Sequence, residues 1–398
     1  MSSPLEKERS QLSFSPSVLS EVLFGSPAAI QEFIKYQEII ANDPILKFQP
    51  ELIGESRVEL FKVMCQKTLR YHELFNYNEP QKAVVRGFFQ FQEQLVTSLH
   101  QGMFKPTIIN LGSEKQAAKW IPLADTYKVL GCYAQTELGH GSDVQSLETI
   151  ATFDKETDSF ILNSPTISST KWWIGDLGKV ANHVVTHAQL IVDGKNYGVQ
   201  TFIVQIRDLE THKPLKGITV GDIGPKYGYN TKDNGYLRFE NVRAPRDNML
   251  AKYSKISKTG EFVRTGNEKI GYATMMTIRG IVICASPLFL SQILTIAARY
   301  SAIRTQFPAE KGEEGTKSED GSKREMTILD YQLQQEKLIP LIADTYAMTF
   351  AAERVVQLLE KNVEKSLRED FSMMPDLHAL LSGCKAVRKK KRQKRKLR

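Results

Sequence analysis

The spacing of apolar residues predicts helices over the first third of the chain, where from about Ala28 to His100 they recur with a helical period. One stripe of apolar residues, at positions i, i+3, i+4 and i+8, indicates a half-buried helix. It consists of Phe61, Met64, Cys65 and Leu69, and Lys67 lies off it. Ser113 and Gln116, three residues apart, form a capping box that begins a further helix. We expect an N-terminal helical domain over residues 1–126.

The period changes to two between Tyr127 and Ala244, which predicts strands. Five segments carry this pattern, and several are rich in β-branched residues: Leu147–Phe153, Phe160–Asn163, His183–Val192, Val199–Ile206 and Tyr236–Phe239. Turn residues separate the segments and no helical pattern intervenes, so we expect an antiparallel sheet or barrel. Pro245 ends this central β-domain, predicted over residues 127–245.

The helical period returns at about Lys269 and continues for about 38 residues. A polar stretch, Pro308–Lys323, predicts a loop, and a second long helix is expected from about Met326 to Leu367. A third helix begins at about Pro375 and is expected to break off into a basic tail. Two helices and a fragment do not close a bundle, so residues 246–386 are interpreted as the first part of a C-terminal helical bundle. Helices, strands and helices in this order predict an α+β fold.

The positive charge of the chain is concentrated at its C-terminal end. The formal net charge is +8, and Arg388–Arg398 hold nine Lys or Arg and no acid, which leaves about −1 for the other 387 residues. A near-neutral body gives no indication of nucleic-acid binding. The basic tail, residues 387–398, has three interpretations. It is a truncated or misread end, a short isoform with a nuclear or nucleic-acid signal, or a polybasic segment that binds a surface, and its partner is unknown.

Several classes of protein are disfavoured by what the chain contains. Four cysteines lie far apart and the histidines lack metal-ligand spacing, which argues against a disulfide framework or a metal site and suits a reducing compartment. Met1–Ser20 lacks the apolar core of a signal peptide. Gly280–Ala298 has the length of a membrane span, but polar residues within it and helical pattern on both sides favour the buried centre of a long helix.

Two segments in the β-region carry candidate chemistry. The first, Tyr133–Val144 (YAQTELGHGSDV), follows an apolar run and offers the Thr136 hydroxyl and two glycines, which let a backbone approach a flat ligand. The second, Lys171–Gly178 (KWWIGDLG), places two tryptophans beside a glycine. Taken singly, the first is more often a plain turn, and the second is more often an aromatic pair in a sheet core.

The two segments together, about 35 residues apart, resemble the flavin site of the acyl-CoA oxidases, the peroxisomal branch of the acyl-CoA dehydrogenase superfamily. The resemblance covers the chain from about residue 15 to Ala386 and continues through three further stretches: Phe160–Thr166 (FILNSPT), Thr211–Tyr229 (THKPLKGITVGDIGPKYGY) and Asp233–Leu250 (DNGYLRFENVRAPRDNML).

The resemblance implies a cofactor, FAD, and a place for it between the β-domain and the C-terminal bundle. Thr136 matches the threonine that contacts FAD, Gly175 matches the glycine beside it, and Arg304 resembles the arginine that reaches the FAD pyrophosphate across a homodimer. The implied reaction converts fatty acyl-CoA to trans-2-enoyl-CoA and passes electrons to O2, giving H2O2, in peroxisomal β-oxidation. The chain ends Lys396-Leu397-Arg398, which is not the Ser-Lys-Leu type of peroxisomal address.

The catalytic base of this reaction is missing from the sequence. The resemblance calls for a glutamate in a Tyr- or Phe-Glu-Gly context, and no such pattern occurs, so no catalytic residue is assigned. We therefore expect a catalytically incomplete chain with apolar helix faces exposed. Two alternatives stay open: a non-catalytic fragment that binds flavin or acyl-CoA or that dimerises, and an acyl-CoA dehydrogenase that passes electrons to a carrier protein.

Overall fold

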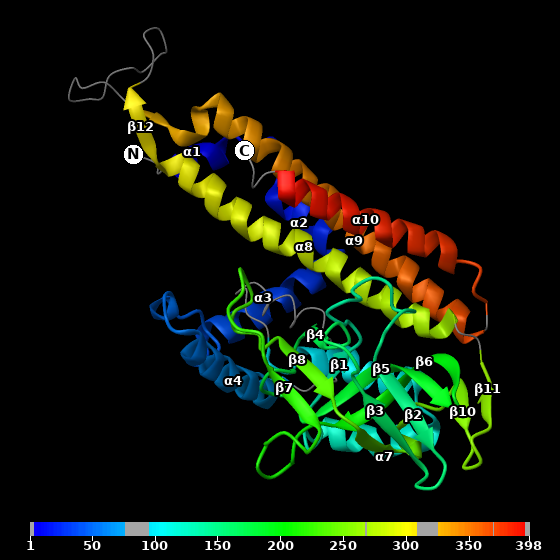
Figure 1. Ribbon diagram of the computed structural model, residues 1–398. Coiled ribbons are helices and arrows are strands. Elements are labelled where there is room, and N and C mark those ends of the chain that lie inside the picture. Colours follow the sequence, from blue (N-terminus) through cyan, green and yellow to red (C-terminus); the bar gives the residue numbers. More distant parts are fainter. Residues whose placement is uncertain (1–3, 76–94, 267–268, 309–324, 369, 395–398) are drawn as a thin grey trace. The chain divides into compact units, whose positions relative to one another are not determined.

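The computed structural model describes residues 4–75, 95–266, 269–308, 325–368 and 370–394. The chain divides into two compact units. The β unit comprises Asn42–Glu79 and Glu93–Thr274, and the helical unit comprises Met1–Ala41, Pro80–Gln92 and Met275–Arg398. Figure 1 shows strands in the first and long helices in the second, which confirms the predicted α+β class. The boundaries of the four segments expected from the sequence stay predictions.

The β unit contains the main sheet of the protein, whose strands follow the order β1-β5-β2-β3-β9, with β6 also paired to β5. Its strands are β1 (Gly131–Ala134), β2 (Ile150–Asp154), β3 (Ser159–Asn163), β5 (His183–Val192), β6 (Lys195–Gln205) and β9 (Val242–Pro245). A three-stranded sheet follows the order β4-β8-β7 and consists of β4 (Lys171–Ile174), β8 (Gly235–Phe239) and β7 (Ile218–Asp222). A hairpin joins β10 (Ser254–Ile256) to β11 (Phe262–Arg264).

Strand β5 lies at the centre of the main sheet and is buried on both faces. Alternate residues of a strand point to opposite faces, and Val184 and Ala188 enter a core shared with residues of the small sheet, such as Leu237. Val185 enters a second core with Phe104 and Trp120 of the helical segments. Those segments are η2 (a π-helix, His100–Phe104), α6 (Lys105–Leu111) and α7 (Glu114–Asp125).

The expectation of a wholly antiparallel sheet is wrong, because β1 and β2 both pair with β5 in parallel. Parallel pairing requires long connections, and the chain provides them before β5. The alternating pattern identifies strands but carries no information on their direction. The remaining pairs of the main sheet, β2·β3, β3·β9 and β5·β6, are antiparallel.

Helix α4 (Arg57–Leu74) of the β unit exists as predicted, and most of its predicted half-buried stripe is confirmed. Met64 is buried and Phe61 and Cys65 are half-buried, whereas Leu69 is 67% exposed. Lys67, predicted off the stripe, is fully buried with its Nζ donating to the Lys47 carbonyl at 3.2 Å. A lysine can bury its aliphatic stem where its ammonium finds acceptors, which apolarity alone does not predict.

The helical unit consists of six described helices and a hairpin: α1 (Pro4–Ser10), α2 (Pro16–Phe24), α3 (Pro27–Asn42), α8 (Lys269–Ile303), α9 (Gln332–Leu367), α10 (Met374–Lys394), β12 (Thr305–Pro308) and β13 (Glu325–Thr327). Helices α8 and α9 are antiparallel neighbours. A Cβ on Gly280 would lie 2.2 Å from Leu359, and at the other end Gln334 donates to Ser301 at 2.9 Å. Glycine at this position permits the close approach of the two helices.

Two predicted helix ends need correction. The second helix begins at Gln332 and not at Met326, because residues 325–327 form β13 against β12. The third helix does not break off before the basic tail, since α10 continues to Lys394. Lysine and arginine are good helix formers, and no proline interrupts them. The predicted loop Pro308–Lys323 lies almost wholly outside the described residues.

The predicted buried centre of α8 is largely exposed. The described residues contain one helical stretch, Val282–Ile303, that is long and apolar enough to cross a membrane. This rests on length and composition only, and the core helix of a soluble protein can pass the same test. Only 22% of its most apolar window is buried, and Ile293 and Ile296 are 55% and 68% exposed. The expected exposure of apolar helix faces is thus confirmed, since α9 and α10 cover only part of this helix.

Candidate functional site

The two candidate segments of the sequence lie side by side in the β unit. The chain leaves β1 at Ala134 and runs along β4, where the Trp172 N–H donates to the Thr136 carbonyl at 3.0 Å and Glu137 pairs with Lys171 in an antiparallel bridge. Thr136 is half-buried, and within the described residues its hydroxyl has no hydrogen-bond partner. This hydroxyl can therefore donate to a ligand.

A buried ion pair fixes the two segments together. The Lys171 Nζ lies 2.9 Å from Glu137 Oε1, and both side chains are fully buried. Lys171 also donates to the His187 carbonyl at 2.7 Å, and Glu137 accepts from the Glu148 and Thr149 amides at 2.8 and 3.0 Å. A buried pair of this kind is stable only when its remaining hydrogen-bonding capacity is satisfied, as it is here.

The pKa values of this pair agree with an ionised state. Burial opposes the charge on Glu137, but Lys171 and hydrogen bonds from Thr149 and Glu148 lower the pKa of Glu137 below its usual value. Burial lowers the pKa of Lys171 to about 8, against the opposing effect of Glu137. Sequence reasoning missed this pair, although both members directly flank residues that it had singled out.

Gly175, immediately after β4, lines a cavity of about 280 Å³. The wall comes from three separate segments of the β unit: Leu99, then Trp173 and Gly175, then Lys226, Gly228, Tyr229, Lys232 and Asn234. A Cβ on Gly175 would lie 3.2 Å from Leu99 Cγ, so a side chain here would press on the opposite wall. Trp173 is 56% exposed and offers a flat apolar surface.

Behind this cavity lies a cluster of buried charges that sequence reasoning also missed. Lys232 forms an ion pair with Asp176, and their side chains are 4% and 1% exposed. Burial raises the pKa of Asp176 to about 6 against the effect of Lys232, and burial likewise raises the pKa of Asp233. Asp233 Oδ2 accepts from the Lys179 and Val180 amides at 2.7 and 3.0 Å. The only sequence signal for this cluster was the Asp in the KWWIGDLG segment.

Arg304, the third predicted cofactor residue, lies in the helical unit. It follows the last residue of α8, is exposed, and donates from its guanidinium to Gln306 Oε1 at 3.0 Å. Its carbonyl accepts from the Ile328 amide at 2.8 Å and joins α8 to the chain before α9. The structure thus brings together the Thr136 and Lys171 segments within one unit and places Arg304 in the other.

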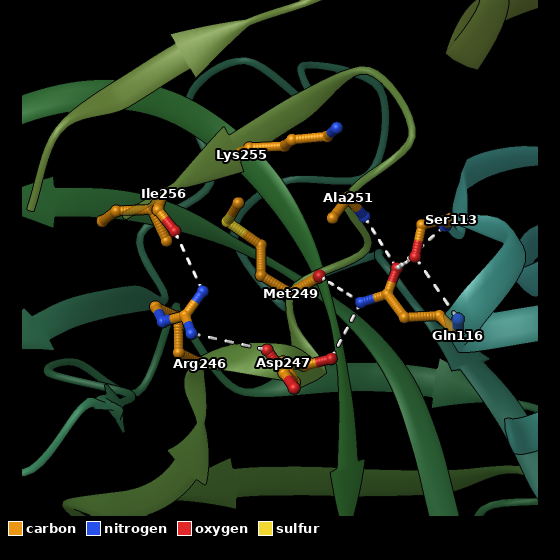
Figure 2. Close-up of a pocket in the computed structure, with 8 residues that line it drawn as sticks. All are labelled: Ser113, Gln116, Arg246, Asp247, Met249, Ala251, Lys255 and Ile256. Carbon is orange, nitrogen blue, oxygen red and sulfur yellow. Dashed lines mark hydrogen bonds and ion pairs between the residues drawn. The ribbon is translucent and has the colours of Figure 1, made fainter. Parts of the chain in front are cut away.

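A second cavity, of about 170 Å³, has a structural role (Figure 2). Gln116 of α7 occupies its edge, donates to the Asp247 and Met249 carbonyls at 2.8 and 2.6 Å, and accepts from the Ala251 amide at 3.0 Å. The same side chain completes the predicted capping box with Ser113, which is confirmed. This cavity is therefore a seam between α7 and the segment after β9. Within the described residues, no group of His, Cys, Asp and Glu could hold a metal ion.

Comparison with known families identifies the class of the protein. Three family models match consecutive parts of the chain: acyl-coenzyme A oxidase N-terminal over residues 15–130, acyl-CoA dehydrogenase middle domain over residues 132–242, and acyl-CoA oxidase C-alpha1 domain over residues 272–395. The middle match places the strands of the β unit in the class of the acyl-CoA dehydrogenases.

Individual relatives narrow this class. Peroxisomal acyl-coenzyme A oxidase 1 of Bos taurus is 42% identical over 393 residues, which cover 97% of this chain and 57% of that protein. The solved structure of Arabidopsis thaliana acyl-CoA oxidase 1 superposes with a TM-score of 0.88 at 40% identity, covering 96% of this chain and 57% of that one. The chain belongs to the acyl-CoA oxidase family, which confirms the resemblance carried by the TELGHG and KWWIG segments.

A third relative was solved with ligands. Acyl-CoA oxidase-2 of Caenorhabditis elegans, bound with FAD, ascaroside-CoA and ATP, has a TM-score of 0.87 at 36% identity and covers 97% of this chain and 57% of that one. The chain thus spans somewhat more than half the length of the relatives that it matches.

Proposed function

We propose that this chain is the FAD-binding part of a peroxisomal acyl-CoA oxidase of fatty acid β-oxidation. The whole enzyme would convert acyl-CoA to trans-2-enoyl-CoA, with O2 as electron acceptor and H2O2 as product. The observation that carries the proposal is the pairing of the Thr136 segment with β4. Gly175, which follows β4, lines a cavity, and this part of the chain matches the acyl-CoA dehydrogenase middle domain. The relatives that match are named as oxidases, which favours an oxidase over a dehydrogenase.

The residues of the β unit fit a flavin. Thr136 would donate its hydroxyl to the edge of the ring, and Gly175 would leave room for the ring where a Cβ would meet Leu99. Trp173 supplies an apolar face of suitable size at the same cavity. When bound, FAD supplies the acceptor for the hydride that leaves the β-carbon of the substrate, which no side chain can replace.

Arg304 is proposed as the cation that binds the FAD pyrophosphate of a second copy of the chain in a homodimer. Its guanidinium contacts only the neutral Gln306 amide among the described residues, so it has donors to offer to a phosphate. Peroxisomal location is proposed from the names of the relatives.

The sequence contains no Tyr- or Phe-Glu-Gly pattern, which is the context expected for the base that removes the α-proton. Glu137, the buried glutamate nearest to the candidate flavin contacts, is committed to Lys171 and to the Glu148 and Thr149 amides, which keeps it ionised but unavailable to a substrate. We therefore propose that the chain supplies flavin binding without α-proton removal. This is also the second candidate function, a non-catalytic flavin-binding chain, and the commitment of Glu137 to Lys171 favours it.

Removing the Thr136 hydroxyl tests the flavin site. Thr136→Val keeps the shape of the side chain and deletes one donor, so FAD affinity should fall by about 3- to 10-fold, the equivalent of one hydrogen bond. Titration of FAD fluorescence with purified chain gives the Kd. Thr219→Val, an exposed threonine on β7, is the matched control and should leave the Kd unchanged. Equal Kd values for both variants would contradict the assignment of Thr136.

A further inference from the structure

Three chain segments that are distant in sequence meet at the wall of the Gly175 cavity. They are the segment 95–99 before η2, the segment 173–178 at the end of β4 and just after it, and the segment 226–234 before β8. All three belong to the β unit. The shape of the cavity therefore depends on what holds these segments at a fixed separation.

One buried side chain contacts two of the segments from the third. Lys232 Nζ donates to the Leu95 carbonyl at 3.0 Å and to Ser98 Oγ at 2.7 Å, and it forms an ion pair with Asp176. Asp176 completes the connection, because its Oδ2 accepts from the Leu99 amide at 2.8 Å. Each segment is thus joined to both of the others through this one pair.

The contacts of Asp176 indicate that the carboxylate has a specific task. Its φ is 64°, in the left-handed region, which Asp adopts more readily than most residues with a side chain, and Trp173 in the same segment has a φ of 69°. The carboxylate is held at this position by Lys232 and by the Leu99 amide. A buried charge adds a desolvation cost that an apolar pair would avoid. Packing alone therefore does not explain the choice of Asp and Lys.

We propose that Asp176 and Lys232 are positioning residues whose ion pair holds the three walls of the Gly175 cavity and thereby sets its affinity for flavin. Lys232 also lines the cavity, but the proposed role of the pair is to join the three walls. This inference rests on the proposed function, since it names which residues keep the flavin pocket in shape.

The test compares Lys232→Met, Asp176→Asn and the double variant with the parent chain. Hydrogen exchange of the flavin-free protein reports on the walls, and fluorescence titration gives the FAD Kd. Each single variant should raise exchange in all three segments and weaken FAD binding by about tenfold or more. The double variant should bind FAD no more weakly than the worse single variant, because residues that act as one unit are non-additive. Lys216→Met, an exposed lysine of the same unit, is the control and should change neither readout.

Three outcomes would overturn the proposal: unchanged Kd values in folded variants, faster exchange confined to the mutated segment, or effects of the two substitutions that multiply. If a charge-removing variant does not fold, Ser98→Ala removes one contact of Lys232 only. It should loosen segments 95–99 and 226–234 and weaken FAD binding two- to threefold. If the parent chain binds no FAD, the proposed function fails, and hydrogen exchange still decides whether the pair holds the walls.

Discussion

Lys171 illustrates how a single residue holds the candidate site together. Its ammonium lies between the Glu137 carboxylate at 2.9 Å and the His187 carbonyl at 2.7 Å, fully shielded from water. Removing one member of a buried pair leaves an uncompensated charge, which is far more costly than the pair is stabilising.

Lys171→Met should therefore lower the free energy of unfolding of the β unit by about 3 to 5 kcal/mol. All three tryptophans, Trp120, Trp172 and Trp173, lie in this unit, so their fluorescence during urea unfolding reports on it selectively. The matched control is Lys155→Met, which removes an exposed ion pair with Asp193 and should cost less than about 1 kcal/mol. Equal losses would contradict the role given to Lys171.

Three histidines of the β unit are buried and a fourth, His72, is half-buried; all four are held in the neutral form, and His100 shows why. Its Nδ1 accepts from the Gly131 amide at 3.0 Å, which leaves Nε2 to donate to the Ala124 carbonyl at 3.1 Å. A proton on Nδ1 would face an N–H donor. Burial lowers the pKa of His72, His100 and His183 to about 4 and that of His187 to about 3.

These histidines predict acid lability of the β unit. Their pKa values are lower in the folded state than the ordinary 6.5. Their contribution to stability is therefore fully present above pH about 6.5 and is lost as the pH falls toward 4. Asp176, whose pKa is raised to about 6, acts in the opposite direction. Burial also raises the pKa of Asp233, so the net loss of stability on acidification is smaller than the four histidines alone would give. Tryptophan-monitored urea unfolding at pH 7.5, 6 and 5 measures it, and a pH-independent midpoint would contradict this account.

Residue-level prediction from sequence depended on local motifs. Thr136 and Gly175 were singled out because the two segments that contain them together resemble a flavin site, and their role in binding a cofactor stays a prediction. The Glu137–Lys171 and Asp176–Lys232 pairs could not, since nothing in a single sequence says which of many charges are buried together. The same limit explains α4, where Lys67 is buried and Leu69 is exposed.

At the scale of elements, the alternating pattern predicted five of the described strands, β2, β3, β5, β6 and β8, and the helical period predicted the long helices. His183–Val192 was predicted with the bounds of β5, whereas the direction of β1 and β2 against β5 was not. Direction depends on which strands become neighbours, which is decided by packing of the two cores on opposite faces of β5 and not by local pattern.

The seam between α7 and the segment after β9 is an element-scale contact with a clear test. Gln116→Ala removes the side chain that joins Asp247, Met249 and Ala251 to the helix start, and it leaves two carbonyls and an amide without their partner. We expect a loss of about 3 kcal/mol in unfolding free energy. Gln66→Ala, on the exposed face of α4, is the control and should stay within about 0.5 kcal/mol. Similar losses for the two variants would show that the seam is not stabilising.

For the whole molecule, the sequence predicted the order of helices and strands but not which surfaces stay uncovered. Helical period shows that α8 and α9 have apolar residues, and the structure leaves several of them exposed in both helices: Ile293, Ile296, Leu333 and Ile339. Whether an apolar helix face is covered depends on the elements that pack against it, and the apolar pattern of the helix does not specify those elements.

The central claim is that this chain binds FAD and lacks the base for acyl-CoA oxidation. One anaerobic titration tests both parts: the visible spectrum of the purified chain is recorded with FAD, and a long-chain acyl-CoA is then added. We predict a protein-bound flavin band that does not bleach. Bleaching would show that a competent base exists among these 398 residues, and the absence of any bound flavin would contradict the assignment of Thr136 and Gly175 to a cofactor site.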